Sequence, residues 1–286
     1  MNLQSLPLIR YANQRLFECF EYLSHVIEPG ISGRDIEEIV KSLLEKKGLQ
    51  PGLLGYRGFP AVCSISANNV AVHGVPNDTP FERLDLCTID IVGCMHGLYV
   101  DGAWTYLVRK KNEPLHDQLA DDELALKLRL LSVAWKTSIL SVRTAITGKT
   151  ISDISLTAVD TARYYKFDIL PGCYGHGIGE NLHQPPHIPF SPKDPLFSEA
   201  KLHRIPQNSV LNIEPVLISR RQGNPHELTV GEDGWSISTR PSALSAQFEF
   251  SVWTGEQGNK KNPGELVSLP GYSVFNDTLL KHPLFF

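Results

Sequence analysis

The sequence predicts an α+β domain with strands at its centre and helices outside. Apolar residues recur at helical spacing in four segments, and strand-like apolar runs lie between these segments. One order of elements also occurs twice along the chain: two helices, a glycine-rich loop, and a strand-like run with an internal acidic residue. Four elements that recur in the same order indicate a domain built from two related halves.

The first copy begins at residues 11–27, where apolar side chains repeat at helical spacing until the sequence EPG ends the run. Ser32 has the features of an N-cap, with Asp35 three residues later, and Gly48 is a suitable end for this second helix. The glycine-rich sequence GYRGFP follows. The next apolar run, CTIDIVG, reads as a strand and contains Asp90.

The second copy repeats these elements. LLSVAWKTSILSVRTAI reads as a helix, and TGKTISDISLTAVDTARYY as the next one. Here Gly148 and Asp153 have the same spacing as Gly30 and Asp35 in the first copy. The sequence GCYGHGIG supplies the glycine-rich loop, and VLNIEPVLI the strand-like run, with Glu214 as its acidic residue.

This duplication predicts a single domain over residues 1–286, with halves at about 11–110 and 124–255. The alternative is two independent α/β domains joined by the polar segment near 110–123. A loop within one domain fits better, because an apolar helix follows this segment.

The composition is that of an ordinary globular protein, with 42% hydrophobic and 20% charged residues and a formal net charge of -4. This acidity argues against nucleic acid as a partner. No apolar stretch is long enough to cross a bilayer, and the N-terminus has no signal-peptide pattern. Five cysteines without CxxC spacing argue against a disulfide framework, so a cytoplasmic protein is expected.

Acidic residues in strand-like runs are the first sign of a functional site. TIDIVGCMHGLYVDGAW reads as two strands joined by GCMHG, which brings Asp90 and Asp101 near each other. Burial of an unpaired carboxylate costs several kcal/mol, so Asp90 and Asp101 need partners. In SALSAQFEFSVW, alternation places Glu249 on the face opposite the phenylalanines. If Glu214 joins the other three, the site requires cations.

Histidines supply further candidates. His176 lies between two glycines, which allow its backbone to approach a site closely; His183 follows seven residues later, and His73 ends an alternating strand. Four carboxylates and an imidazole indicate a two-metal hydrolase. GxSxG, GxxxxGK[ST] and HExxH patterns are absent from the sequence.

Over nearly its whole length the chain resembles the type I methionine aminopeptidases, metallopeptidases of the pita-bread (creatinase/aminopeptidase) fold. The residues that carry the resemblance are GYRGFPAVCSISANNVAVHGVPND, TIDIVGCMHGLYVD, GHGIGENLHQPP, NIEP and DGWSISTRPSALSAQFE. The resemblance implies two pseudo-symmetric halves with a central antiparallel sheet and outer helices. It also implies a monomer that removes methionine from the N-termini of peptides or nascent proteins.

The same resemblance implies two divalent cations, whether Mn, Fe, Co or Zn. Asp90 would be a terminal ligand of one ion, Asp101 and Glu249 would bridge both, and His176 and Glu214 would complete the second. A water or hydroxide between the ions would attack the substrate carbonyl. The implied catalytic residues are His73, His183 and Glu214. The implied substrate-binding residues are Tyr56, Phe59, His73, His183 and Trp235.

The chain also departs from the usual family pattern. The family usually has His at the position of Arg57, Thr or Ser at that of Gly102, and an aromatic residue at that of Leu182. At Phe250-Ser251 it usually has His-Thr, and Ser64 stands about where the family has a pocket cysteine. These departures leave two alternatives: a metallopeptidase with another specificity, or an inactive pita-bread binding protein. Arg57, a guanidinium at the rim of the pocket, would favour an acidic side chain or a C-terminal carboxylate nearby.

Overall fold

The structure, a computed structural model, describes residues 5–110, 122–146, 148–220, 227–240, 242–255 and 265–266. Its α-helices are α1 (Leu6–Leu23), α2 (Gly33–Lys46), α3 (Asp122–Thr144) and α4 (Ile151–Tyr164). Short 3-10 helices are η2 (Tyr56–Gly58), η4 (Pro195–Phe197) and η5 (Ala200–Leu202). The polar segment considered as a linker lies mostly outside the described residues.

The strands fall into the two halves of the chain. Those of the first half are β1 (Gln50–Pro51), β2 (Cys63–Ala67), β3 (Val70–Val72), β4 (Leu86–Met95) and β5 (Leu98–Leu107). Those of the second half are β6 (Phe167–Ile169), β7 (Tyr174–Ile178), β8 (Gln184–Pro189), β9 (Val210–Ile213), β10 (Val216–Ser219), β11 (Glu227–Val230), β12 (Ile237–Arg240), β13 (Ser245–Gln247), β14 (Phe250–Trp253) and β15 (Glu265–Leu266). All the recorded strand pairs are antiparallel.

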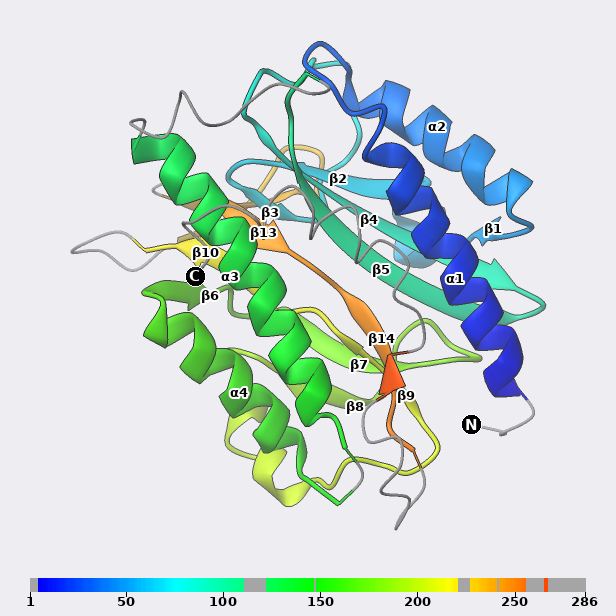
Figure 1. Cartoon of the computed structure of the whole chain (residues 1–286), viewed down its shortest axis with the longest axis vertical. Helices are drawn as coiled ribbons and strands as arrows, with labels where there is room; N and C mark the ends of the chain where they lie inside the picture. The colour runs from blue at the N-terminus through cyan, green and yellow to red at the C-terminus, as the bar shows by residue number, and fades with distance from the viewer. Residues whose placement is uncertain are drawn as a thin grey trace.

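Helices cover the strands of both halves (Figure 1). Helices α1 and α2 pack on the first half, with α1 against β4 and β5 and α2 against β1 and β2. Helices α3 and α4 pack on the second half, with α3 against β9, β10, β13 and β14 and α4 against β6 and β8. One hydrophobic cluster draws buried residues from all four helices and from the strands of both halves. This is the pita-bread architecture that the resemblance implied.

The helix starts of the two halves are built alike. In α2, the Ser32 side chain accepts a hydrogen bond from the Asp35 N–H while Asp35 accepts one from the Ser32 N–H. Thr150 and Asp153 form the same capping box at α4. Gly30 and Gly148, two residues before these caps, both have φ of +99°, a conformation that glycine adopts without strain. The N-cap predicted at Ser32 is confirmed, and the repeated spacing of Gly148 and Asp153 corresponds to the same cap at Thr150.

The strand ladders of the two halves correspond as well. In the first half, β4 pairs with β5 along its whole length, so that Asp101 lies opposite Val92. In the second half, β9 pairs with β14 and β10 with β13, and the two ladders share one continuous register. This register places Glu249 opposite Glu214, in the interval between the paired segments.

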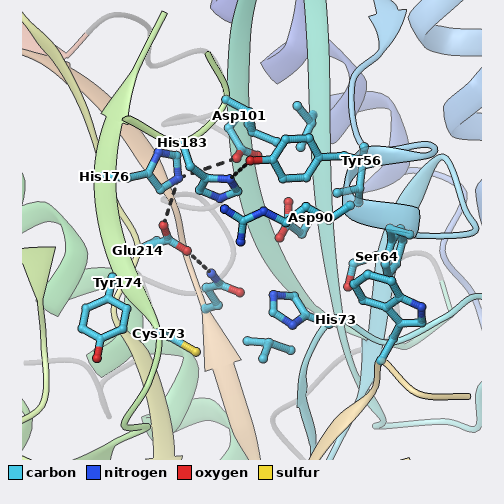
Figure 2. A pocket seen from close by; sticks show the side chains of 18 of the residues that line it. Tyr56, Ser64, His73, Asp90, Asp101, Cys173, Tyr174, His176, His183 and Glu214 are labelled. Atoms are coloured by element: carbon cyan, nitrogen blue, oxygen red, sulfur yellow. Dashed lines mark hydrogen bonds and ion pairs between the residues drawn. The ribbon is translucent and has the colours of Figure 1, made fainter. Parts of the chain in front are cut away.

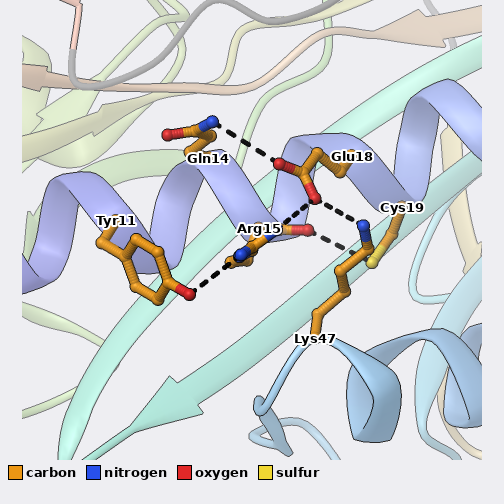
Figure 3. Close-up of polar contacts among 6 residues, drawn as sticks. All are labelled: Tyr11, Gln14, Arg15, Glu18, Cys19 and Lys47. Carbon is orange, nitrogen blue, oxygen red and sulfur yellow. Dashed lines mark hydrogen bonds and ion pairs between the residues drawn. The ribbon is translucent and has the colours of Figure 1, made fainter.

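Helix α1 and the C-terminal end of α2 are joined by a polar cluster (Figure 3). Lys47, which follows α2, forms an ion pair with Glu18 of α1, and Arg15 binds the same carboxylate at 3.0 Å. The two bonds outweigh the effect of burial and lower the pKa of Glu18. This cluster links the two helices that cover the first half.

Two predicted elements differ from the structure, and the β4–β5 hairpin defines how the two predicted neighbours Asp90 and Asp101 are placed. Helix α1 begins before residue 11 and ends at Leu23, where the chain turns, so Ile27 lies beyond it. The sequence GCYGHGIG forms strand β7 over most of its length, so the prediction of a loop there was wrong. Asp90 faces Ala103 rather than Asp101 across the hairpin, and the two acids are therefore diagonal neighbours. Among the described helices, none is long and apolar enough to span a membrane.

Candidate metal centre and active site

The acidic residues converge from four different strand segments. Asp90 lies in β4 and Asp101 in β5, Glu214 lies between β9 and β10, and Glu249 between β13 and β14. His176 of β7 completes the group, with Nε2 3.3 Å from Glu214 Oε1 and 4.0 Å from Asp101 Oδ2 (Figure 2). Ligand atoms of Asp101, His176 and Glu249 all lie within 4.8 Å of one another.

Glycines allow His176 to reach this group. A Cβ atom at Gly175 would lie 2.5 Å from the Asn212 carbonyl oxygen in β9, and one at Gly177 would lie 2.5 Å from the Pro185 carbonyl oxygen in β8. Both distances are shorter than side chains tolerate, so β7 can lie between its neighbours only with glycine at these positions. The close approach predicted for the His176 backbone is thus present, in a strand instead of a loop.

Two of the four carboxyl groups, Asp101 and Glu249, are buried and Asp90 and Glu214 are half-buried, and none has a lysine or arginine partner among the described residues. Burial raises the pKa of Asp90 to about 6, and burial together with the other acids raises the pKa values of Asp101, Glu214 and Glu249. The Oδ1 atoms of Asp90 and Asp101 are buried without a hydrogen-bond partner.

The tautomer of His176 points to a cation as well. Its Nδ1 lies 3.0 Å from the Gly177 carbonyl oxygen, which can only accept a hydrogen bond, so Nδ1 carries the proton. Burial lowers the pKa of His176 to about 4, which leaves Nε2 unprotonated at neutral pH. An unprotonated nitrogen thus faces carboxyl oxygens, and a bound cation satisfies such a convergence of lone pairs. The donor set of oxygens and imidazole fits divalent transition metals.

Hydrogen bonds from the second half hold two of these acids. Asn212 Nδ2 donates to Glu249 Oε1 at 2.8 Å, and Ser251 Oγ donates to Asn212 Oδ1 at 2.6 Å. Gln247 Nε2 donates to Glu214 Oε2 at 3.2 Å. Sequence reasoning gave none of these three polar residues a role in the site. Strand alternation was the available signal, because Asn212 precedes Glu214 by two residues and Gln247 precedes Glu249 by two.

A cavity of about 320 Å³ opens above the metal-ligand candidates. His183 lies in its wall, where Nδ1 is 2.9 Å from the Tyr56 hydroxyl and the imidazole ring centroid is 4.3 Å from that of His176. His73 follows β3 with φ of +57° and also faces the cavity. Loss of hydration in the cavity lowers the pKa of both His73 and His183, which favours neutral imidazoles at pH 7.

The structure brings together every residue that the sequence analysis placed in the site. Phe59 and Trp235 meet edge to face with ring centroids 5.3 Å apart, and Leu182 completes this apolar side. Glu249 lies beneath the cavity, beside Asp101. The cavity is lined by the other predicted residues, namely Tyr56, Phe59, His73, Asp90, Asp101, His176, His183, Glu214 and Trp235.

Two departures from the family pattern lie behind the acids and pack together. Phe250, next to Glu249, stacks on Phe17 of α1 with ring centroids 6.1 Å apart. A Cβ atom at Gly102, next to Asp101, would lie 3.3 Å from a ring carbon of Phe20 and 3.5 Å from one of Phe17. A larger residue at 102 would therefore crowd the aromatic group, so glycine and phenylalanine at these positions are complementary.

The pita-bread fold, the buried carboxylate–histidine cluster beneath a cavity and the match to a metallopeptidase family together define a metal-dependent hydrolase. The chain belongs to metallopeptidase family M24, whose model matches residues 7–254. Among its relatives are a methionine aminopeptidase of Aquifex aeolicus, 30% identical over 89% of this chain and 94% of that protein, and methionine aminopeptidase 1 of Bacillus subtilis, 28% identical over the same shares.

Solved structures agree on the fold. The methionine aminopeptidase of Rickettsia prowazekii superposes with a TM-score of 0.79 at 21% identity, over 94% of this chain and 98% of the other. The prolidase of Pyrococcus furiosus superposes with a TM-score of 0.65 at 18% identity, over 93% of this chain and 64% of the other. The family to which the chain belongs consists of metallopeptidases, and the buried donor set fits a divalent metal.

Proposed function

We propose that this protein removes methionine from the N-termini of peptides and nascent proteins with the aid of two divalent cations. The observation that carries the proposal is the buried group of Asp101, His176 and Glu249, whose donor atoms converge without a positive partner among the described residues. The names of the curated relatives support methionine as the residue removed.

We assign the ligands as follows. Asp101 and Glu249 would be shared by both ions, Asp90 would hold one of them, and His176 and Glu214 would hold the other. When bound, two such ions polarise the peptide carbonyl group and lower the pKa of water toward neutrality. Mn, Fe, Co and Zn all suit this donor set.

The chain's own residues then bind and orient the substrate and move its protons. The Tyr56 hydroxyl donates a hydrogen bond to Nδ1 of His183, so the proton of this neutral imidazole is on Nε2. The Nε2–H group can then donate a hydrogen bond to the substrate carbonyl oxygen. His73, neutral and opposite in the cavity, binds the peptide backbone. Glu214, held by Gln247, takes the proton of the attacking water and passes it to the leaving amine.

The apolar side of the cavity receives the first side chain. Tyr56, Phe59, Leu182 and Trp235 offer no charge there, which suits the flexible and apolar methionine. Apolar pockets discriminate by only about 1–3 kcal/mol per methylene, so we expect leucine and norleucine to be cleaved more slowly rather than rejected. The second residue should be small.

Other expectations remain proposals of the same kind. One catalytic domain over residues 1–286 is supported by the hydrophobic cluster that both halves share. A cytoplasmic location is supported by the five free cysteines, a pattern typical of a reducing compartment. The monomeric state stays a prediction.

A panel of short peptides tests the function. The protein is stripped of metal, reloaded separately with Mn, Fe, Co or Zn, and incubated with Met-Ala-Ser and with peptides that begin Met-Lys or Met-Trp. We expect release of methionine from Met-Ala-Ser only after metal is restored. Full turnover by protein shown by elemental analysis to be metal-free would contradict metal dependence. Release of a different N-terminal residue, with Met-Ala-Ser intact, would favour a peptidase of altered specificity.

A further inference from the structure

Arg57 occupies an unusual position at the mouth of the active-site cavity. It lies in η2 with φ of +51°, a left-handed conformation that side chains other than glycine and asparagine rarely adopt. Gly55 and Gly58 beside it also have positive φ. The segment therefore turns tightly, and the arginine lines the cavity while remaining exposed. Backbone of this kind persists where the surrounding structure holds it, often at ligand-binding sites.

The ring contact recorded for Arg57 is with Tyr56. Its guanidinium carbon lies 5.5 Å from the centroid of the Tyr56 ring, and that ring lies 5.3 Å from the ring of His183. Across the described residues no ion pair with a carboxylate is recorded for Arg57. The charged residues that line the cavity are thus this one cation at the mouth and the three acids Asp90, Asp101 and Glu214 at the base.

Such a guanidinium is well suited to bind a carboxylate of the substrate. Its contact with the Tyr56 ring keeps the guanidinium beside the cavity, and its donors can present a fork that matches two carboxylate oxygens. Added together, the distance from Arg57 to the Tyr56 ring and the distance from that ring to the His183 ring match the length of about three residues of an extended peptide. A carboxylate on the second or third residue of a bound peptide is therefore within reach.

We propose that Arg57 forms a carboxylate-binding subsite that makes short acidic peptides, or short peptides with a free C-terminus, preferred substrates of this enzyme. The proposal rests on the aminopeptidase function proposed above and specifies its substrate class. The same chemistry can come from an acidic side chain or from the terminal carboxylate, and peptides distinguish the two sources.

The test compares kcat/KM within matched peptide pairs, using the metal-loaded protein. Met-Ala-Glu-amide against Met-Ala-Gln-amide isolates a side-chain carboxylate. Met-Ala-Gln with a free C-terminus against its amide isolates the terminal carboxylate. We expect a preference of about five- to tenfold for the charged member of at least one pair, as for a hydrogen bond to a charged group at a partly exposed site. The preference should shrink as salt is raised from about 20 to about 500 mM, because salt screens exposed charges.

Variants at position 57 then assign the preference. Arg57→Asn removes the charge while tolerating the left-handed backbone, and it should reduce the ratio within each pair to about one. Arg57→Lys keeps the charge without the fork and should retain part of the preference, whereas Arg57→Glu should invert it. Arg34→Gln, at an exposed arginine paired with Asp78 on α2's side of the molecule, serves as the control and should leave the ratios unchanged.

Equal kcat/KM within both pairs for the unmodified protein would overturn the subsite, as would a preference that survives in Arg57→Asn. The neutral peptide Met-Ala-Gln-amide tests the aminopeptidase function separately, because it lacks a carboxylate. If the metal-loaded protein cleaves none of the peptides, the proposed function fails. Calorimetric binding of the same pairs to the unmodified protein and to Arg57→Asn then decides on the subsite alone.

Discussion

In the first half of the molecule Asp101 lies opposite Val92, whereas in the second half Glu249 lies opposite Glu214. With Asp101 and Glu249 taken as the corresponding acids, Asp90 of β4 corresponds to Asn212 in β9, two residues before the position that faces each acid, and not to Glu214, with which the sequence repeat matched it. The pairing of the strands is therefore repeated in the two halves, while most of the side chains at corresponding positions differ. One carboxylate occurs at the same place in both halves, and the other positions differ.

This difference shows how a duplicated fold can hold an asymmetric site. The equivalent acids Asp101 and Glu249 meet at the junction of the halves, where the Glu249 N–H donates to the Ala103 carbonyl oxygen at 2.9 Å. The first half adds an acid, Asp90, where the second has the amide of Asn212. The second half adds His176, where the first has Ser64. Two ions in such a site would have unlike ligands.

The largest effect should come from removing either of the equivalent acids. We expect Asp101→Asn and Glu249→Gln each to reduce bound metal per protein and to lower kcat/KM by more than about a hundredfold, because outer residues alone cost up to that factor. Elemental analysis and peptide cleavage measure the two quantities. Asp168→Asn, at a surface acid paired with Arg220, is the control. Normal metal content in both site variants would refute their bridging role.

Replacing His183 should slow the reaction while sparing the metal. His183→Ala removes a donor to the substrate carbonyl oxygen, and kcat should fall by roughly 10²–10³. Tyr56→Phe removes only the hydroxyl that orients this imidazole and should have a smaller effect of the same kind. Loss of metal from His183→Ala would contradict its assignment as a substrate-binding residue.

The amide network of the second half should affect metal affinity to a smaller degree. Asn212→Ala frees one oxygen of Glu249, and we expect divalent-metal affinity to fall by about 10–100-fold. Ser251→Ala removes the hydrogen bond to the side-chain oxygen Oδ1 of Asn212 and should have a weaker effect. Ser64→Ala, at the first-half position that corresponds to His176, should leave the affinity unchanged. Calorimetric titration of metal into the three variants would sharpen or break the comparison of the halves.

The two capping boxes should give the smallest and most similar effects. Ser32→Ala and Thr150→Ala should each lower the free energy of unfolding by about 1 kcal/mol, measured by urea denaturation. Hydrogen bonds from the cap residues lower the pKa values of Asp35 and Asp153. A carboxyl whose folded pKa is lowered stabilises above its unfolded pKa, and this contribution is lost as pH falls below about 4. In Asp35→Asn and Asp153→Asn the acid-induced loss of stability should be reduced.

The helix caps could be predicted from the sequence more completely than the site. The capping boxes are predictable because their hydrogen bonds join residues three apart, so that the whole interaction lies within one short segment. Likewise the β4–β5 turn at His96 and Gly97 lies within the predicted GCMHG, and both residues have positive φ. Residue patterns alone pointed to four acids and an imidazole at one two-metal site, and the resemblance to a family chose His176 among the histidines and gave each ligand its role.

The features that escaped prediction depend on contacts between distant segments. β7 was taken for a loop because glycines disfavour strands, but Gly175 and Gly177 are required by the carbonyl oxygens of neighbouring strands. The bond from Asn212 to Glu249 joins residues 37 positions apart, and its existence depends on the register of β9 against β14. The stacking of Phe250 on Phe17 likewise joins opposite ends of the chain.

The continuous register of β9–β10 against β13–β14 also limits how this chain can change length. Side chains alternate along a strand, so one inserted or deleted residue in Val210–Ser219 would turn the residues beyond it to the opposite face. Either Asn212 or Glu214 would then leave the site while the opposing acid stayed. A length change in this region keeps the register only where a matched change occurs on the other side of the ladder or a β-bulge absorbs it. A single substitution leaves the register as it is.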